Sequence, residues 1–533
     1  MPQDAPKATL PFPRGTTLVV LVVISLMLHV GASRASTPTP VTDRPNIVVI
    51  LLDDLDWAVF DAAIGNLPAV QNLQARGTTF DQYYVTTPLC CPSRSSLLRG
   101  QYAHNHGVLW NRGEPGGNGG FEAFHRLGRE TDTVATALHH AGYRTGLFGK
   151  YLNGYPMSMP ETYEPPGWDD WAVHTASERD AFYIDYDLNV NGTIVSYGSA
   201  PEDYSTDVLR DFGAAFIRST PVEQPLFLVL APYAPHAPSM PAVRHVDVAA
   251  NAEFRRAPSF NESDVSDKPE WVRKLPPIDA AITAEIDADV ANRVASLMAI
   301  DDMVAEVSAA LEESGRGDST YIVFLSDNGF HFGEHRVPFG KVTPYGESTR
   351  VPMIVVGPGV PAGSHNSAIV ANIDLFPTFL GWAGVTSLPE FVDGRDVAGV
   401  INLTEDPTRQ RILLEQFEDV ANRAPRAVKP PKPGKKLKDR TPTPTTTTSL
   451  SQAILPPFRA VRDATSLFVV YETGELEYYD LVLDPYAMNN LATQLDPVFI
   501  TAQLALVDSL ATCAGASCRV LEDGENASPQ VGQ

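Results

Sequence analysis

The stretch NIVVILLDD, from Asn46 to Asp54, decides the fold class. Six apolar residues follow one another without a polar interruption, which is typical of a strand covered on both faces. Similar apolar runs recur along the chain at 143–148, 226–231, 321–326 and 353–357. Helical patterns lie between them, notably at 133–142 and 278–315. Alternating helices and buried strands predict an α/β domain with a doubly wound, mostly parallel sheet.

The character of the sequence changes after about residue 400. The tract 423–450 is rich in proline, lysine and threonine, so it cannot bury a core and we expect a disordered insertion. Beyond it, FRAVRDATSLFVVYETGELEYYDL has the pattern of antiparallel strands, with a turn near Thr473 and Gly474. The chain is therefore predicted to comprise a main α/β domain at 43–400, a smaller α+β subdomain with an antiparallel sheet at 401–520, and a flexible tail at 521–533.

The first residues have the pattern of an export signal. Lys7 and Arg14 precede the apolar run LVVLVVISLML, and small residues follow in GASRAS. Because this run is short for a membrane span, we expect a signal peptide at 1–35, cleaved after Ala35 or Ala32. With no later span, the mature protein is predicted to be secreted, to a periplasm, a cell surface or a lysosome. The net charge of −24 argues against nucleic acid as a partner.

Two of the four cysteines are adjacent, in LCCPSRSSLLRG at 89–100. The other two, Cys513 and Cys518, are close enough to form a small disulfide loop. Cys90 and Cys91 could form a strained vicinal disulfide or remain as two buried thiols. A third interpretation places Cys90 at a helix start, where backbone N–H groups bind anions and lower a thiol pKa.

Polar side chains follow four of the apolar runs, at the edge of the sheet where ligands collect in open parallel sheets. They are Asp53 and Asp54 after the first run, Lys150 after the second, His236 after the third, and Asp327 and Asn328 after the fourth. The three aspartates and the asparagine offer only oxygen ligands, which select Ca²⁺ or Mg²⁺ over zinc or copper. The alternative, that each aspartate caps a helix, explains one such residue better than four.

The adjacent cysteines carry a resemblance to a known family. The sequence from Cys90 through Pro92, Ser93, Arg94 and Leu98 to Gly100 resembles the sulfatase signature Cys-x-Pro-Ser-Arg-x-x-x-Leu-x-Gly. The resemblance extends from about residue 44 to 491, through blocks such as GYRTGLFGKYLNGY, APHAP, FLSDNGFHFGEHR and YYDLVLDPYAMNNLA. GKYLN and DNGFHFGEH look most like the N-acetylglucosamine-6-sulfatase, heparan endosulfatase and arylsulfatase branch. The family implies an alkaline-phosphatase-like fold.

The resemblance implies a formylglycine-dependent mechanism. Cys90 would be oxidised to Cα-formylglycine by the formylglycine-generating enzyme during export, and its hydrated aldehyde would attack the sulfur of a sulfate ester. One Ca²⁺ ion would be held by Asp53, Asp54, Asp327, Asn328 and residue 90. The charge on the transferring group would be offset by Arg94, Lys150 and Lys341, and His236 would contact the sulfate or transfer a proton. Leu152 departs from the arylsulfatase pattern, which has histidine there, and Asn153 is a candidate replacement.

Three functions follow from these residues. The leading prediction is hydrolysis of sulfate monoesters, on a sulfated sugar such as N-acetylglucosamine-6-sulfate, with aryl sulfates as further substrates. The alternatives are a phosphonate monoester or phosphodiester hydrolase with the same site, and a catalytically silent binder of sulfated glycans. The basic tract at 423–440 has two interpretations, a docking arm for sulfated polysaccharide or, favoured here, a solvated insertion.

Other polar residues are weaker candidates. His331 and His335 could line the pocket or be structural, and we expect packing roles for His104 and His106. The remaining expectations are structural: an ion pair of Glu347 with Arg350 and helix positions for Asp301 and Asp302.

Overall fold

A computed structural model describes residues 44–112, 116–175, 182–249, 254–418 and 455–524. The expected signal peptide and the tract 423–450 lie outside these residues. Among the helices within these ranges, none has the length and apolar character needed to cross a bilayer.

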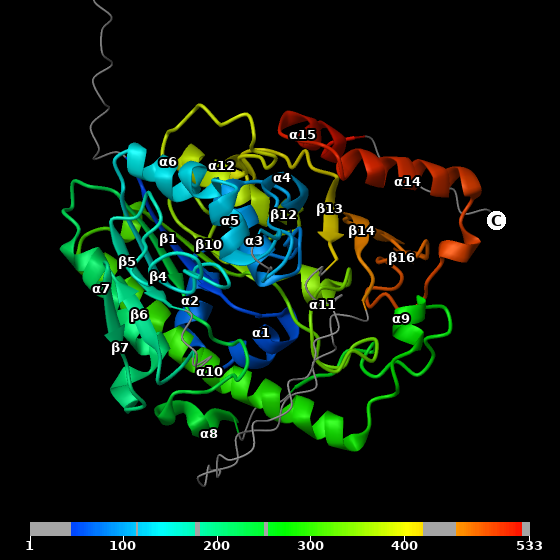
Figure 1. The fold of residues 1–533 in the computed structure, drawn as a ribbon, viewed down its shortest axis with the longest axis horizontal. Coiled ribbons are helices and arrows are strands. Elements are labelled where there is room, and N and C mark those ends of the chain that lie inside the picture. Colours follow the sequence, from blue (N-terminus) through cyan, green and yellow to red (C-terminus); the bar gives the residue numbers. More distant parts are fainter. Residues whose placement is uncertain (1–43, 113–115, 176–181, 250–253, 419–454, 525–533) are drawn as a thin grey trace, which may run out of the picture. The chain divides into compact units, whose positions relative to one another are not determined.

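The central sheet has ten strands in the order β11-β2-β10-β9-β1-β8-β4-β5-β6-β7. Figure 1 shows part of it, with β1, β4, β5, β6, β7 and β10 labelled. Strand β1 (Asn46–Leu52) lies between β8 (Leu226–Ala231) and β9 (Thr320–Ser326) and pairs with both in parallel. Strand β4 (Arg144–Gly149) extends the parallel part beyond β8. Every residue of β1, β8 and β9 is buried, as their unbroken apolar runs require.

The fifth predicted strand, β10 (Met353–Val356), runs antiparallel to β9. At the opposite edge, β5 (Asp170–His174) is parallel to β4, while β6 (Asp187–Val190) and β7 (Thr193–Ser196) are antiparallel additions. The sheet is therefore mostly parallel, and all five apolar runs that suggested it form strands.

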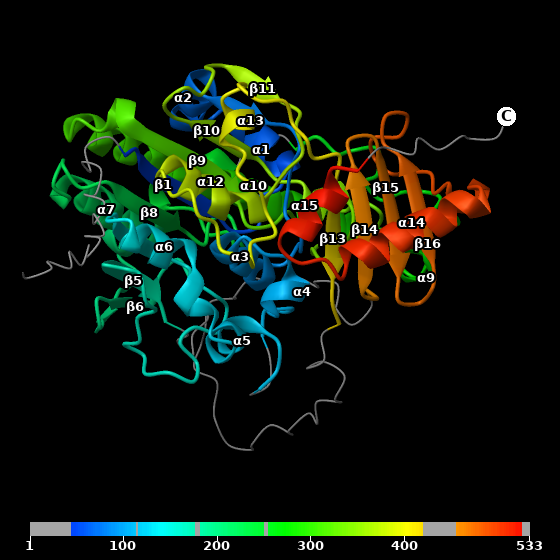
Figure 2. The same cartoon turned by 90° about the horizontal axis from the view of Figure 1, so that it is seen from above.

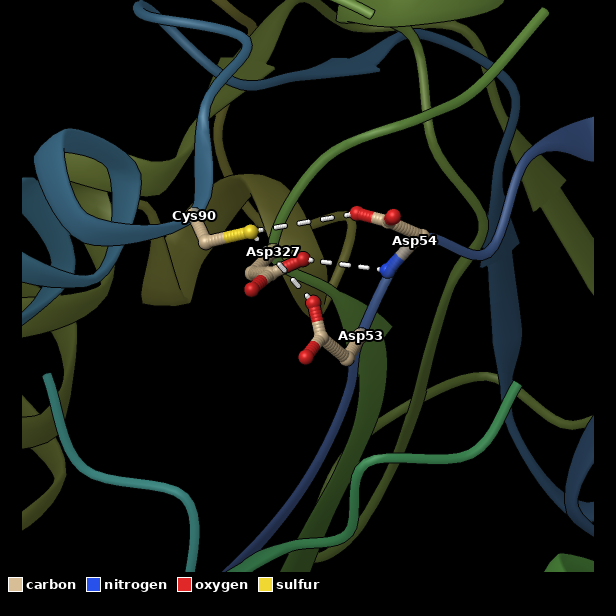
Figure 3. Close-up of side chains that lie close together, drawn as sticks. All are labelled: Asp53, Asp54, Cys90 and Asp327. Atoms are coloured by element: carbon tan, nitrogen blue, oxygen red, sulfur yellow. Dashed lines mark hydrogen bonds between the residues drawn. The ribbon is translucent and has the colours of Figure 1, made fainter. Parts of the chain in front are cut away.

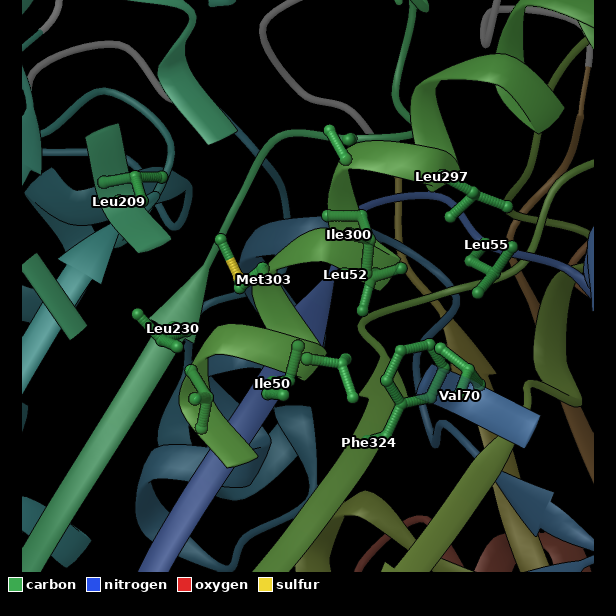
Figure 4. Packing of buried hydrophobic residues seen from close by; sticks show 14 of the residues in the cluster. Ile50, Leu52, Leu55, Val70, Leu209, Leu230, Leu297, Ile300, Met303 and Phe324 are labelled. Carbon is green, nitrogen blue, oxygen red and sulfur yellow. The ribbon is translucent and has the colours of Figure 1, made fainter. Parts of the chain in front are cut away.

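Alternate residues of β1 enter two hydrophobic cores, one on each face of the sheet. On one face, Ile50 and Leu52 pack with α1 (Trp57–Ile64), α7 (Ser205–Ser219) and α10 (Ala280–Glu313). Figure 4 shows this core with Leu209 of α7 and Leu297 of α10. On the other face, Val49 and Leu51 pack with α3 (Cys90–Arg99), α6 (Val134–His140) and α12 (Leu375–Trp382). Helices on both faces confirm the doubly wound architecture.

The remaining elements comprise the outer strands β2 and β11 of the central sheet, the separate pair of β3 with β12, and short helices. They are α2 (Pro68–Arg76), β2 (Thr78–Phe80), β3 (Tyr83–Tyr84), α4 (Ala103–His106), α5 (Gly120–Arg126), α8 (Val246–Ala249), α9 (Glu270–Arg273), α11 (Gly346–Thr349), β11 (Ser364–Asn366), β12 (Val370–Ala371) and α13 (Ala398–Ile401). Helix α10 confirms the long helical pattern at 278–315, and its N-cap Asp279 accepts from the Ile282 N–H.

A second, four-stranded antiparallel sheet follows near the C-terminus (Figure 2). It consists of β13 (Arg411–Gln416), β14 (Phe458–Asp463), β15 (Ser466–Tyr471) and β16 (Leu476–Asp480). Gly474, with φ +85°, lies in the turn between β15 and β16, as the sequence predicts. Helices α14 (Pro497–Leu510) and α15 (Ala516–Glu522) follow. The boundary expected near residue 400 stays a prediction.

Buried ion pairs hold the last helix of the described chain against the rest of the structure. Cys513 and Cys518 form the predicted disulfide. Helix α15 continues into the range expected to be a flexible tail, because Glu522 is fully buried and accepts from Arg395 and Arg409. Residues 525–533 lie outside the described residues.

Candidate active site

The polar residues that follow β1 and β9 lie side by side because these two strands pair in register. Leu52 of β1 pairs with Ser326 of β9, so Asp53 and Asp54 emerge beside Asp327 and Asn328. The Asp54 backbone N–H donates to Asp327 Oδ1 at 3.2 Å (Figure 3). Asp54 has φ +62°, a left-handed conformation that is uncommon for residues other than glycine, although aspartate adopts it more readily than most. The sequence prediction that these residues converge is thus fulfilled geometrically.

Cys90 faces this cluster from the first position of α3, whose N-cap, Leu89, is extended. Its Sγ lies 3.5 Å from Asp53 Oδ1 and 3.9 Å from Asp54 Oδ1. One ligand atom each from Asp53, Asp54, Cys90 and Asp327 falls within 4.8 Å of all the others, and all four residues are buried. This carboxylate-rich donor set suits a hard cation such as Ca²⁺.

Asn328 completes the oxygen donors. Its Nδ2 donates to Asp54 Oδ1 at 2.6 Å, which orients the amide with Oδ1 away from that carboxylate. Oδ1 is contacted only weakly, by Lys341 Nζ at 3.5 Å, among the groups in the described part of the chain. A carbonyl oxygen so placed is available to a cation, and the residues therefore fit a calcium site.

Three cationic side chains face the three carboxylates. Lys150 Nζ donates to Asp53, Lys341 Nζ donates to Asp54, and Arg94 Nε donates to Asp327 Oδ2 at 2.7 Å. Lys341 Nζ also lies 2.8 Å from Cys90 Sγ. Within the described ranges, Arg94 Nη2 is buried without a hydrogen-bond partner, so a donor remains for a bound anion.

The cations set the ionisation of the carboxylates. Burial opposes the charge of Asp53, but Lys150, followed by His236 and Arg94, holds its pKa well below the usual range. Asp54 shows the same balance: burial opposes its charge, but Lys341, His236 and Arg293 together lower its pKa. The pKa of Asp327 is raised by burial and by the neighbouring Asp53. Two of the three carboxylates are thus firmly ionised.

The expectation that the helix start lowers the Cys90 thiol pKa is wrong. Burial raises the pKa of Cys90 to about 12 and outweighs the attraction of Lys150 and Lys341. Cys90 and Cys91 are free thiols, so the vicinal disulfide is not formed. Cys91 packs in the core, and its backbone N–H donates to Asn111 Oδ1 at 2.8 Å. An unmodified Cys90 is therefore a poor nucleophile at neutral pH.

His236 lies at the accessible side of the cluster. Its Nε2 is 3.6 Å from Asp54 Oδ2, and its side chain is 27% exposed, against 9% for Lys341. Nδ1 lies 2.6 Å from the Ala237 carbonyl, so Nδ1 carries the proton and Nε2 faces the site.

The weaker candidates lie elsewhere or serve the fold. Leu152 is in a hydrophobic core, and the Asn153 carbonyl accepts from the Phe121 N–H. His331 and His335 are fully buried against Thr343 and Glu262. His104 contacts Glu415, and His106 contacts Ser96. Asp301 accepts from the Val70 N–H, and Asp302 pairs with Arg244.

The expected Glu347–Arg350 ion pair is not formed. Helix α11 ends at Thr349, and Arg350 has an extended conformation, so the two residues do not share a helix face. Arg350 instead donates to the Asp81 carbonyl at 3.2 Å and lies over the Trp57 ring.

One group of contacts had no signal in the sequence. Arg293 of α10 donates to the Asp54 carbonyl at 3.0 Å, and Asp289, one turn earlier, accepts from Arg293 at 2.9 Å. In the sequence this pair has the spacing of an ordinary ion pair on a helix surface.

Comparison with known proteins agrees with this geometry. The Drosophila melanogaster "Extracellular sulfatase SULF-1 homolog" is 36% identical over 381 residues, 70% of this chain and 32% of that protein, so the chain spans about a third of its length. Human "N-acetylglucosamine-6-sulfatase" is 29% identical over 518 residues, covering 92% of this chain and 89% of that protein.

Solved structures share the fold. A complex with the substrate D-glucosamine-2-N,6-O-disulfate has a TM-score of 0.70 at 22% identity and covers 91% of this chain and 100% of that one. A phosphonate monoester hydrolase from Silicibacter pomeroyi has a TM-score of 0.62 at 23% identity, with 88% and 94% covered. The sequence model of the family described as "Sulfatase" matches residues 45–385. The chain therefore belongs to the sulfatase family of sulfuric ester hydrolases.

Proposed function

We propose that the protein hydrolyses sulfate monoesters with residue 90 as the nucleophile and a single Ca²⁺ ion beside it. The observation that carries the proposal is the convergence of Asp53, Asp54, Asp327, Lys150 and Lys341 around the Cys90 sulfur. Oxygen ligands on one side and cations on the other are what a transferring sulfuryl group requires.

Each residue has a distinct part. Conversion of Cys90 to Cα-formylglycine supplies a hydrated aldehyde where the thiol has a pKa of about 12. A bound Ca²⁺ supplies Lewis-acid polarisation of the sulfate oxygens. Lys341 and Lys150 contact the carboxylates and stabilise negative charge near residue 90. Arg94 offers its unpaired Nη2 to an anion. His236 presents Nε2 for proton transfer at the entrance.

The proposed substrate is a sulfated sugar such as N-acetylglucosamine-6-sulfate, with aryl sulfates accepted because their leaving groups are good. The support comes from relatives named N-acetylglucosamine-6-sulfatase, which align over 92% of this chain. We also propose export through a signal peptide at 1–35 and modification by a formylglycine-generating enzyme, which the family resemblance suggests. A relative described as extracellular supports export.

The first test is mass spectrometry of the peptide containing Cys90, from protein exported by its native host. An aldehyde at residue 90 supports the proposal, whereas a thiol in folded, exported protein contradicts it. The second test compares turnover of an aryl sulfate in the chelated protein and after addition of Ca²⁺ or Mg²⁺. We expect Ca²⁺ to restore the activity.

The alternative reaction is hydrolysis of phosphonate monoesters or phosphodiesters. The observation in its favour is the shared fold of a phosphonate monoester hydrolase. Because likeness at this identity concerns the fold alone, we rank it second. Rates on matched aryl sulfate and aryl phosphonate esters separate the two, and a higher kcat/KM on the phosphonate would reverse the order.

A further inference from the structure

Helix α10 contacts the backbone of Asp54, which has a left-handed conformation. The Asp54 carbonyl accepts from Arg293 Nη1 at 3.0 Å. The Arg293 side chain is fully buried, and its guanidinium lies 4.5 Å from the Phe330 ring centre and 4.9 Å from that of Phe332. A planar, permanently charged donor packed against two neighbouring rings has little freedom to move. Arg293 therefore fixes the carbonyl of a residue whose φ is +62°.

Asp289 joins Arg293 to the segment that carries His236. One oxygen of Asp289 accepts from Arg293 Nε at 2.9 Å, and the other accepts from Ser239 Oγ at 3.1 Å. Ser239 is fully buried and has φ +52°, so it too is held in a left-handed conformation. Its position three residues after His236 makes it the anchor of that segment.

These contacts form a closed ring. Starting at Asp54, the ring passes through Arg293 and Asp289 to Ser239, returns along the backbone to His236, and closes at the 3.6 Å contact between His236 Nε2 and Asp54 Oδ2. Two adjacent turns of one rigid helix thus contact both the segment with a proposed calcium ligand and the segment with the proposed proton-transfer group.

We propose that Asp289 and Arg293 act as a positioning pair, which sets the distance between Asp54 and His236. The inference rests on the proposed function, because it assigns Asp54 to the metal and His236 to the substrate. Neither member of the pair touches the reacting atoms. Residues that orient metal ligands in this way change metal affinity by about 10- to 100-fold when they are lost.

The test measures calcium affinity by calorimetry on the purified full-length protein. Arg293→Met keeps an apolar side chain of similar length against the two rings but removes the donor, and we expect its Kd for Ca²⁺ to rise about 10- to 100-fold. Arg293→Lys keeps a charge that can reach one acceptor, so a smaller increase is expected. An unchanged Kd in Arg293→Met overturns the inference.

Two control variants separate positioning from stability. Asp301→Asn alters another buried acid of α10, which accepts from the Val70 N–H, and Arg316→Met alters a buried arginine that donates to the carbonyls of Thr220 and Pro221. Both should keep the wild-type Kd even where the melting temperature falls. If the Kd for Ca²⁺ rises as the melting temperature falls in all variants, controls included, the inference is overturned.

The contact of Asp289 with Ser239 is tested by a separate measurement. Asp289→Ala removes the acceptor of Ser239, so we expect kcat on an aryl sulfate to fall by more than the Kd for Ca²⁺ rises. In Arg293→Met we expect the opposite, with the Kd for Ca²⁺ rising by more than kcat falls. Equal changes in both quantities for both variants contradict the assignment. Wild-type protein that binds no Ca²⁺ refutes the proposed function as well, whereas a calcium-binding wild type with unaffected variants refutes the inference alone.

Discussion

Lys341 contacts two groups at once, the Asp54 carboxylate and the Cys90 sulfur. The carboxylate raises the Lys341 pKa despite the burial that opposes its charge, so the ammonium is charged throughout the physiological range. A fixed positive charge beside the nucleophile position is most valuable when negative charge develops there during the reaction.

We predict that Lys341→Met lowers kcat/KM on an aryl sulfate by about 10²- to 10³-fold. Lys268→Met is the matched control, because Lys268 is a buried lysine that lies away from the cluster and donates to the Ala487 carbonyl at 2.6 Å. Turnover per folded molecule should stay close to wild type in the control. A Lys341→Met enzyme within threefold of wild type would remove Lys341 from the mechanism.

At the residue scale, the sequence predicted side chains whose position depends on a strand end. Asp53, Lys150 and Asp327 come directly after buried runs, so the strand-end rule places them correctly. It could not predict Arg293, because a charged residue in a helix shows no sign of which buried carbonyl it meets. Nor could it predict the raised pKa of Cys90, which depends on burial by segments far away in the sequence.

Strand β5 carries a buried histidine that makes stability depend on pH. His174 is 7% exposed, lies 3.3 Å from Ser205 Oγ, and contacts the rings of Tyr186 and Tyr233. Burial lowers its pKa to about 3. In the unfolded chain the pKa of His174 is about 6.5. Below that pH the unfolded state therefore binds a proton that the folded state does not bind.

His174 therefore destabilises the fold as the pH falls from about 6.5 towards 3, by about 1.4 kcal/mol per pH unit. We predict that His174→Gln removes this contribution, so that its free energy of unfolding falls less steeply with pH than that of wild type. Urea unfolding at pH 6.5, 5.5 and 4.5 measures the slopes. The exposed His365→Gln variant should keep the wild-type slope, and equal slopes for all three proteins would contradict the prediction.

At the element scale, long elements with a strong pattern were predictable and short edge elements were not. The apolar run of β9 and the 34-residue helix α10 have unambiguous periodicity. Strands β6 and β7 are four residues each and partly exposed, and their pairing is determined by neighbours rather than by their own composition. The direction of β10 also follows from its connection, which no local pattern encodes.

The C-terminal sheet contacts the loop that carries Lys341 through one buried carboxylate. Glu477 of β16 is fully buried and accepts from the hydroxyls of Tyr345, Tyr471 and Tyr479 at 2.7 to 2.8 Å. Tyr345 lies four residues after Lys341, in the chain segment between β9 and β10.

We predict that Glu477→Ala lowers the free energy of unfolding by about 3 kcal/mol or more, because three buried hydroxyls lose their acceptor. It should also reduce sulfate turnover through displacement of the Lys341 loop. The exposed Glu472→Ala is the control and should change stability by about 0.5 kcal/mol or less. Urea unfolding measures both, and equal stabilities for the two variants would contradict the role of Glu477.

For the chain as a whole, the sequence predicted the C-terminal sheet but not the buried contacts between the C-terminal region and the main domain. Glu415 of β13 contacts His104, 311 positions away, and Glu522 accepts from Tyr102, 420 positions away. Such buried polar contacts involve residues that look like ordinary surface charges until the tertiary structure pairs them. The C-terminal sheet therefore completes the main domain.

The strand order also determines when Cys90 can be reached. In the folded protein Cys90 is 1% exposed, and the segments that carry two of the charged groups beside its sulfur, Asp327 and Lys341, follow it much later in the chain. During synthesis, the cysteine emerges long before those segments exist. The modifying enzyme proposed above would have an interval, set by the time needed to make and fold some 250 further residues, in which the thiol is open. On that proposal, a chain that folds before it is modified keeps its thiol.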